Sequence, residues 1–128
     1  MKKIEDWMVA QVKLVRMGAI TGANNGNTAV ALVRPNTAEV RLHGNHIATV
    51  YGGGMRFTLA GWNTNTTRSR VNALLNAFAR GHVTTCKGQA HYSVYGPIGN
   101  DWWIATGPDG TGVLPGRWHG NFPLEESK

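Results

Sequence analysis

The chain has 128 residues, of which 41% are hydrophobic and 16% are charged, and its thirteen Lys and Arg against seven Asp and Glu give a formal net charge of +6. This length suits one domain with one core, the single cysteine excludes an internal disulfide framework, and no apolar run is long enough for a membrane span. We therefore expect a soluble, cytoplasmic protein whose positive charge attracts polyanions such as nucleic acid.

The first predicted element is a helix over residues 4 to about 17. Four apolar residues recur near helical spacing, Ile4, Met8, Val12 and Val15. Residues 21–27 read T-G-A-N-N-G-N, which is typical of a polar connector rather than of core. We therefore interpret residues 1–20 as an N-terminal helix or separable arm, followed by a single domain over residues 27–128.

From Thr28 the hydrophobic period changes from 3.6 to 2. Four short strands are predicted in T-A-V-A-L-V-R, A-E-V-R-L-H, H-I-A-T-V-Y and M-R-F-T-L, each bounded by Pro, Asn or Gly. This pattern predicts an antiparallel meander with one face in the core and the other in solvent. Arg41, His43 and Arg56 are expected on the solvent face.

The clearest helix signal in the chain ends before Gly81, a residue suited to the left-handed conformation that often follows a helix. Four apolar side chains share one face and are expected to pack on the sheet, Val71, Leu74, Leu75 and Phe78. The hydroxyls of Thr66 and Thr67 are predicted to cap the start. Arg68 and Arg70 stand in the opening turn, where acidic side chains are usual, so we interpret this turn as an anion-receiving site. The structural alternative is a turn with solvated arginines.

Three further strands are predicted after this helix, in V-T-T-C, A-H-Y-S-V-Y and D-W-W-I-A-T. Adjacent residues of a strand point to opposite faces, so one of Trp102 and Trp103 should be exposed. The tail from about residue 107 is rich in Gly and Pro and is predicted to be irregular, held over the fold by Trp118 and Phe122. The expected fold class is α+β: an antiparallel meander with one helix packed on it, further C-terminal strands and an N-terminal helix.

The sequence offers little for catalysis or for metal binding. The five histidines and the cysteine fall in no zinc-ligand spacing, and the acids are too scattered to suggest a carboxylate pair. One element, His91-Tyr92-Ser93, matches half of a two-histidine phosphodiesterase motif. We therefore predict no enzymatic activity, no catalytic residue, no cofactor and no metal, with a small phosphodiesterase or nuclease as a third-ranked alternative.

A basic and aromatic surface remains as the candidate site. Rings that stack bases beside cations that neutralise phosphates are typical of single-strand binders. The predicted nucleic-acid- or anion-binding residues come from the solvent face of the sheet and from the helix start: Arg41, His43, Arg56, Trp62, Thr64, Thr66, Thr67, Arg68 and Arg70. The structural alternative is that these aromatic rings complete the core.

Two segments, R-L-H-G-N-H-I-A (41–48) and A-G-W-N-T-N-T-T-R-S-R-V-N-A-L-L (60–75), resemble a family of small proteins encoded by tailed bacteriophages. The resemblance covers roughly residues 27–76. It implies a protein made in the cytoplasm of an infected bacterium, acting on phage or host nucleic acid or on a host defence component.

The leading hypothesis is that the protein binds nucleic acid without catalysis, single strands in preference to duplex. The second is a host-takeover or counter-defence protein that binds a bacterial protein or sequesters a nucleotide signal. The sequence leaves the oligomeric state open, a homodimer included.

Overall fold

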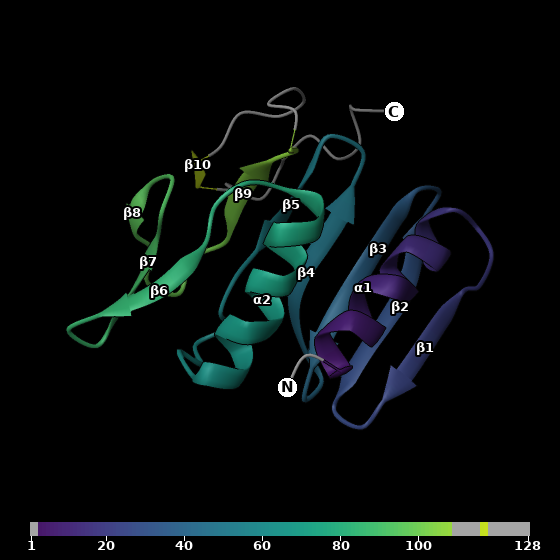
Figure 1. The fold of residues 1–128 in the computed structure, drawn as a ribbon, viewed down its shortest axis with the longest axis horizontal. Helices are drawn as coiled ribbons and strands as arrows, with labels where there is room; N and C mark the ends of the chain where they lie inside the picture. Colours follow the sequence, from purple (N-terminus) through teal and green to yellow (C-terminus); the bar gives the residue numbers. More distant parts are fainter. Residues whose placement is uncertain (1–2, 109–115, 118–128) are drawn as a thin grey trace.

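The computed structural model describes residues 3–108 and 116–117, and this part of the chain has the predicted α+β fold (Figure 1). Its elements are α1 (Lys3–Arg16), β1 (Gly22–Asn25), β2 (Thr28–Arg34), β3 (Thr37–Leu42), β4 (Asn45–Tyr51), β5 (Gly54–Phe57), α2 (Asn65–Phe78), β6 (Val83–Cys86), β7 (Gln89–Tyr92), β8 (Gly96–Pro97), β9 (Trp103–Thr106) and β10 (Gly116–Arg117). Neither helix is long and apolar enough to cross a membrane, within the residues described.

Every strand pairing in these residues is antiparallel, in two sheets. The larger sheet has the order β1-β2-β3-β4-β5-β9-β10, and the smaller has the order β6-β7-β8. The predicted four-stranded meander is confirmed as β2 to β5, with β9 extending it beside β5. The polar segment 21–27 contains a strand, β1, so its interpretation as a simple connector was wrong.

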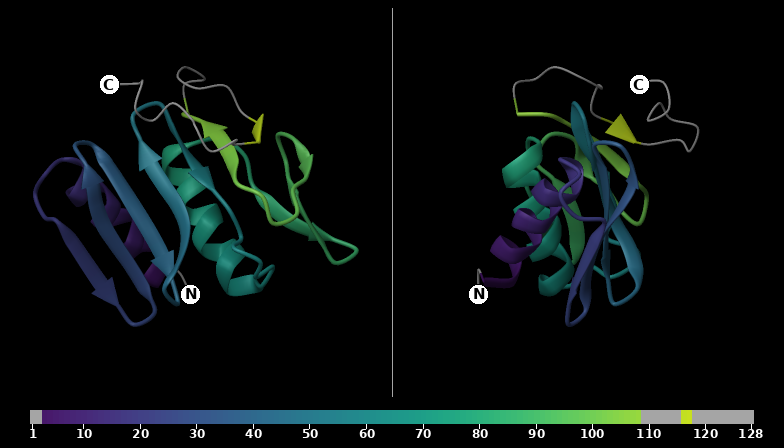
Figure 2. Two further views of the ribbon diagram at one scale, coloured as in Figure 1. Left: turned by 180° about the vertical axis from the view of Figure 1, so that it is seen from behind. Right: turned by 90° about the vertical axis from the view of Figure 1, so that its right-hand side faces the viewer.

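Both helices lie on the same face of the larger sheet, as the view along the sheet edge shows (Figure 2). α1 contacts β1, β2 and β3, while α2 contacts β4, β5 and β6. The core therefore lies between one layer of strands and one layer of helices. The opposite face of this sheet carries the alternate side chains, among them Glu39, Arg41 and Arg56.

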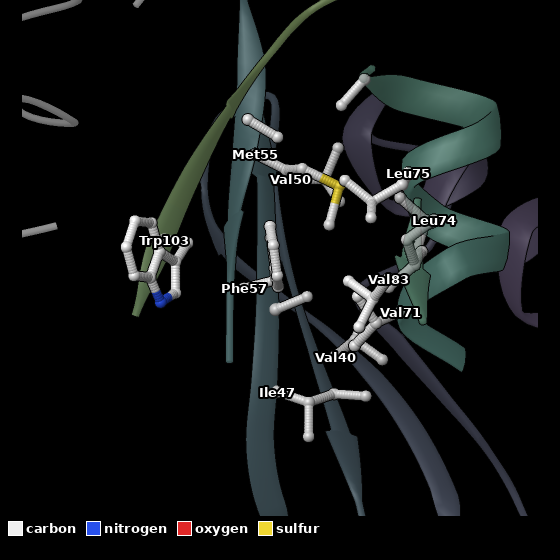
Figure 3. Packing of buried hydrophobic residues seen from close by; sticks show 14 of the residues in the cluster. Val40, Ile47, Val50, Met55, Phe57, Val71, Leu74, Leu75, Val83 and Trp103 are labelled. Atoms are coloured by element: carbon white, nitrogen blue, oxygen red, sulfur yellow. The ribbon is translucent and has the colours of Figure 1, made fainter. Parts of the chain in front are cut away.

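The helix predicted over residues 71–78 packs on the sheet as expected (Figure 3). Val71, Leu74 and Leu75 of α2 are fully buried. They pack with apolar side chains from the strands, including Val40, Ile47, Val50, Met55 and Phe57. Burying each of these side chains contributes about 1.5–3 kcal/mol, so this interface is the main source of α2's stability.

The N-terminal helix is part of the same core rather than a separable arm. Met8, Val12 and Val15 are fully buried in the cluster that contains the α2 side chains. A buried ion pair also joins the helices: Arg70 Nη1 lies 3.1 Å from Glu5 Oε2. α1 therefore folds with the sheet and cannot detach without exposing apolar surface.

The ends of α2 differ from the prediction. Thr64 is the N-cap, and its hydroxyl accepts a hydrogen bond of 3.2 Å from the backbone N–H of Thr67. Thr66 and Thr67 thus lie inside the helix. Ala79 caps the C-terminus in an extended conformation, and Gly81 adopts the left-handed φ of +99° two residues later, against the ring of Tyr92.

The two adjacent tryptophans behave as predicted for a strand. Trp103 is buried in the core cluster, whereas Trp102, which immediately precedes β9, is partly exposed. Most of the predicted irregular tail, with Trp118 and Phe122, lies outside the described residues.

Candidate functional site

A pocket of about 460 Å³ lies where the start of α2 meets the turn between β3 and β4. Its apolar part comes from buried side chains, Leu42, Ile47 and Leu59, with Ala60 beside them. Its polar and aromatic part comes from His43, Asn45, Trp62, Thr64, Thr66 and Thr67. This volume lies within the usual range for small-ligand sites, and none of the lining residues is acidic.

Trp62 dominates the exposed part of this pocket. The residue is 59% exposed, although its backbone N–H is fixed by a hydrogen bond of 2.8 Å to the carbonyl of Leu59. A tryptophan on an ordered backbone with much of its ring in solvent leaves apolar area uncovered. It therefore offers a stacking surface at the pocket.

The first turn of α2 supplies the polar groups. The N–H of Thr67 is satisfied by Thr64, while the N–H groups of Asn65 and Thr66 precede the first intrahelical hydrogen bonds. Thr66 is exposed and lines the pocket. Its donors and hydroxyl, beside the positive end of the helix dipole, favour a ligand with negative charge.

Arg68 and Arg70, paired in the sequence prediction, occupy different environments. Arg68 donates to the side-chain oxygens of Asn63 and Asn65, the latter at 2.5 Å, so its guanidinium lies at the helix start. Arg70 is only 8% exposed and donates to Glu5 and, at 3.1 Å, to the hydroxyl of Thr28. Its position between the helices gives it a structural role.

Arg41 lies on the face of the larger sheet opposite the helices. It forms an ion pair with Glu39 and donates to the carbonyl of Gly44, at 3.2 Å, in the turn next to the pocket. His43 is not on this face. It belongs to the same turn, with a left-handed φ of +54°, and it lines the pocket instead.

The remaining predicted arginine, Arg56, lies in a group with Trp102 and His46 on the face of the larger sheet opposite the helices. Its guanidinium lies 5.1 Å from the ring centre of Trp102, and the ring of His46 lies 4.7 Å from the same tryptophan. His46 Nε2 is also 2.8 Å from the hydroxyl of Thr49. Burial lowers the pKa of His46, the Glu39 carboxylate opposes this shift, and the charge of Arg56 adds to it, so that the net shift is downward.

The nine predicted residues therefore separate into four places. Five line the pocket, His43, Trp62, Thr64, Thr66 and Thr67, whereas Arg68 is bonded to Asn63 and Asn65 at the helix start and does not line it. Arg41 and Arg56 lie on the face of the larger sheet opposite the helices, and Arg70 lies between the helices. Asn45 was missed, although it follows His43 and Gly44 in the same turn and turn asparagines commonly present their side chains. Leu42, Ile47 and Leu59 were missed as pocket residues because their apolar pattern indicated only core.

In the described part of the chain, no three His, Cys, Asp or Glu side chains gather into a group that could hold a metal ion. Comparison with curated proteins and with solved structures gives no match. Among protein-family models, that of the Kyanoviridae Gp96 protein matches residues 1–107. This match covers both helices, strands β1 to β9 and every residue that lines the pocket. The chain therefore belongs to the Kyanoviridae Gp96 family of phage proteins.

Proposed function

We propose that this phage protein binds single-stranded nucleic acid without catalysis, and that the pocket at the start of α2 is its binding site. The observation that carries the proposal is Trp62, a largely exposed ring beside a pocket that contains hydroxyl and amide donors and no carboxylate. A base is flat and apolar on its faces and carries hydrogen-bonding groups on its edge. Trp62 suits the face, and Asn45 and Thr66 suit the edge or the adjoining phosphate.

The charge of the chain supports the same function. A formal charge of +6 raises the local concentration of a polyanion. Arg41 is bonded to Gly44 in the turn that forms one side of the pocket, and Arg68 lies at the start of α2, which forms another side. Duplex DNA suits the site less well, because its bases are stacked on one another and do not offer their faces to Trp62. An unpaired strand exposes those faces.

The test is titration of the full chain with a labelled single-stranded oligonucleotide, followed by anisotropy and by tryptophan emission. Trp62→Ala should weaken binding by about fivefold or more, since a base stacked on an aromatic ring contributes about 1–3 kcal/mol. Trp62→Phe should retain most of the affinity and lose most of the emission change. Met17→Ala is the matched control, because Met17 is also an exposed large apolar side chain but does not line the pocket.

Binding should also weaken as salt rises, since phosphate contacts release counterions. Equal affinity of Trp62→Ala and the unaltered protein would contradict the proposal, as would the absence of binding at tens of micromolar. A second candidate function is sequestration of a free nucleotide, which the pocket volume of about 460 Å³ favours. Tight binding of a mononucleotide would support it.

A further inference from the structure

A second pocket lies on the other side of the loop that leads into α2. It has a volume of about 560 Å³ and is formed largely by the turn between β6 and β7 and by the segment between β8 and β9. Gly88, Asn100 and Asp101 are among its lining residues, together with Trp103 and Arg117. Apart from the loop that contains Asn63, it is built from elements that the first pocket does not use.

The loop over residues 60–64 is a ridge shared by the two pockets. Trp62 and Thr64 line the first pocket, whereas Asn63 between them lines the second. The ridge is fixed in place, because Asn63 donates to the hydroxyl of Thr85 and to the carbonyl of Gly88. Arg68 donates to the side-chain oxygen of the same asparagine. The two pockets therefore adjoin across a single ordered segment.

Charge around the ridge suits a phosphate passing over it. Arg68 lies at Asn63, and Lys87, which is exposed, precedes Gly88 in the second pocket. Arg117 also lines that pocket and forms an ion pair of 3.2 Å with Asp101. Asp101 is the one carboxylate among the residues that line either pocket, in the part of the chain that the structure describes.

We infer that the nucleic-acid site extends over both pockets: a single strand crosses the ridge at Asn63 with one nucleotide in each pocket and its connecting phosphate near Arg68. The inference rests on the proposed function and adds the second pocket and the minimum length of the ligand. An oligonucleotide of at least two units should bind much better than a mononucleotide, because only the longer ligand reaches both pockets. The second pocket then determines how affinity depends on oligonucleotide length, while Trp62 determines the affinity for a single nucleotide.

The experiment measures the affinity of the full chain for oligothymidylates of one, two, four and eight nucleotides. We expect affinity to rise by about tenfold or more between one nucleotide and four. Arg117→Ala should weaken the tetramer several-fold and leave the mononucleotide unchanged. Asp101→Asn should tighten the tetramer several-fold, because it removes a repelling carboxylate and frees Arg117. Lys13→Ala, a change of an exposed lysine on α1, is the control for loss of net charge.

The two variants of the second pocket make the test independent of folding damage, since a misfolded Asp101→Asn protein would not bind more tightly. Equal affinities for one and for eight nucleotides would overturn the inference and leave the first pocket as a mononucleotide site. The same holds if neither Arg117→Ala nor Asp101→Asn changes the affinity for the tetramer. Failure of every oligonucleotide to bind would overturn the proposed function itself, so the two results are distinguishable.

Discussion

Replacement of Arg70 by methionine tests whether this arginine holds the helices together. The side chains of Arg70 and Glu5 are only 10% and 14% exposed, so Arg70→Met leaves a largely buried carboxylate with Ser69 as its remaining side-chain donor. Breaking a buried pair by removing one partner costs about 3–5 kcal/mol, and the residual exposure of Glu5 places the expected cost near the lower end. For a domain of this size that corresponds to a decrease in Tm of roughly 10 °C.

The pH dependence gives a second readout for the same pair. Burial raises the pKa of the Glu5 carboxyl, but hydrogen bonding, chiefly from Ser69, and the charge of Arg70 outweigh burial and bring the pKa below its ordinary value of 4.5. A carboxyl whose pKa is lower in the folded state contributes stability above the unfolded pKa and loses it as the pH falls through the folded pKa. Without Arg70 the folded-state pKa of Glu5 should rise, so in Arg70→Met this acid-dependent loss should be smaller and should end at a higher pH.

Thermal and urea unfolding by circular dichroism measure both effects. The double variant Glu5→Gln/Arg70→Met should recover much of the loss, because no charge is then left buried without a partner. Lys13→Met is the surface control on α1 and should unfold within about one degree of the unaltered protein, since exposed substitutions rarely exceed about 0.5 kcal/mol. An unchanged Tm in Arg70→Met, or no recovery in the double variant, would refute the structural role.

Three further predictions concern the fold around the site. Gly81→Ala should destabilise the protein by about 2 kcal/mol or more, because φ is +99° and the added Cβ would lie 2.3 Å from the Tyr92 ring; an unchanged urea midpoint would contradict this. Thr64→Ala should cost about 1 kcal/mol through loss of the α2 N-cap, with Thr64→Ser nearly neutral, and equal losses in the two would argue against capping. Since the pKa of His46 is below its ordinary value of 6.5, the unfolded chain takes up the proton first as the pH falls below that value. Stability should therefore decline on the acid side of 6.5 in thermal unfolding, and the same decline in His46→Gln would assign it to another group.

The meander and α2 could be predicted because their patterns are local. Alternation around Val40 and Met55 and the 3.6-residue spacing of Val71 and Leu74 arise from which face each side chain buries, and the structure confirms both. β1 could not be predicted in this way. Gly22–Asn25 is polar because most of it is exposed at the sheet edge, so its strand conformation depends on pairing with β2 rather than on its own pattern.

The candidate site was only partly predictable for a related reason. Arg68 and Arg70 are two residues apart in a helix, so their side chains point in different directions. Only the position of α1 decides that Arg70 contacts Glu5. His43 follows the alternation of β3 in the sequence, but the turn gives it a positive φ and redirects its side chain. A contact between residues far apart in sequence decides the first outcome, and the conformation of a local turn decides the second.

The ridge over residues 60–64 shows how the fold connects these separate parts. Ala60 and Gly61 both have positive φ, so the chain turns sharply after β5 before it enters α2. Asn63 then uses its amide to join the start of α2 to Thr85 of β6 and to Gly88 in the turn after it, over 22 and 25 residues of sequence. Both pockets are consequently formed before any ligand arrives, and a ligand that spans them loses less free energy to ordering of the protein than it would on mobile loops. Substitution Asn63→Ala should for this reason weaken longer oligonucleotides more than a mononucleotide, even though Asn63 lies between the pockets rather than at the centre of either.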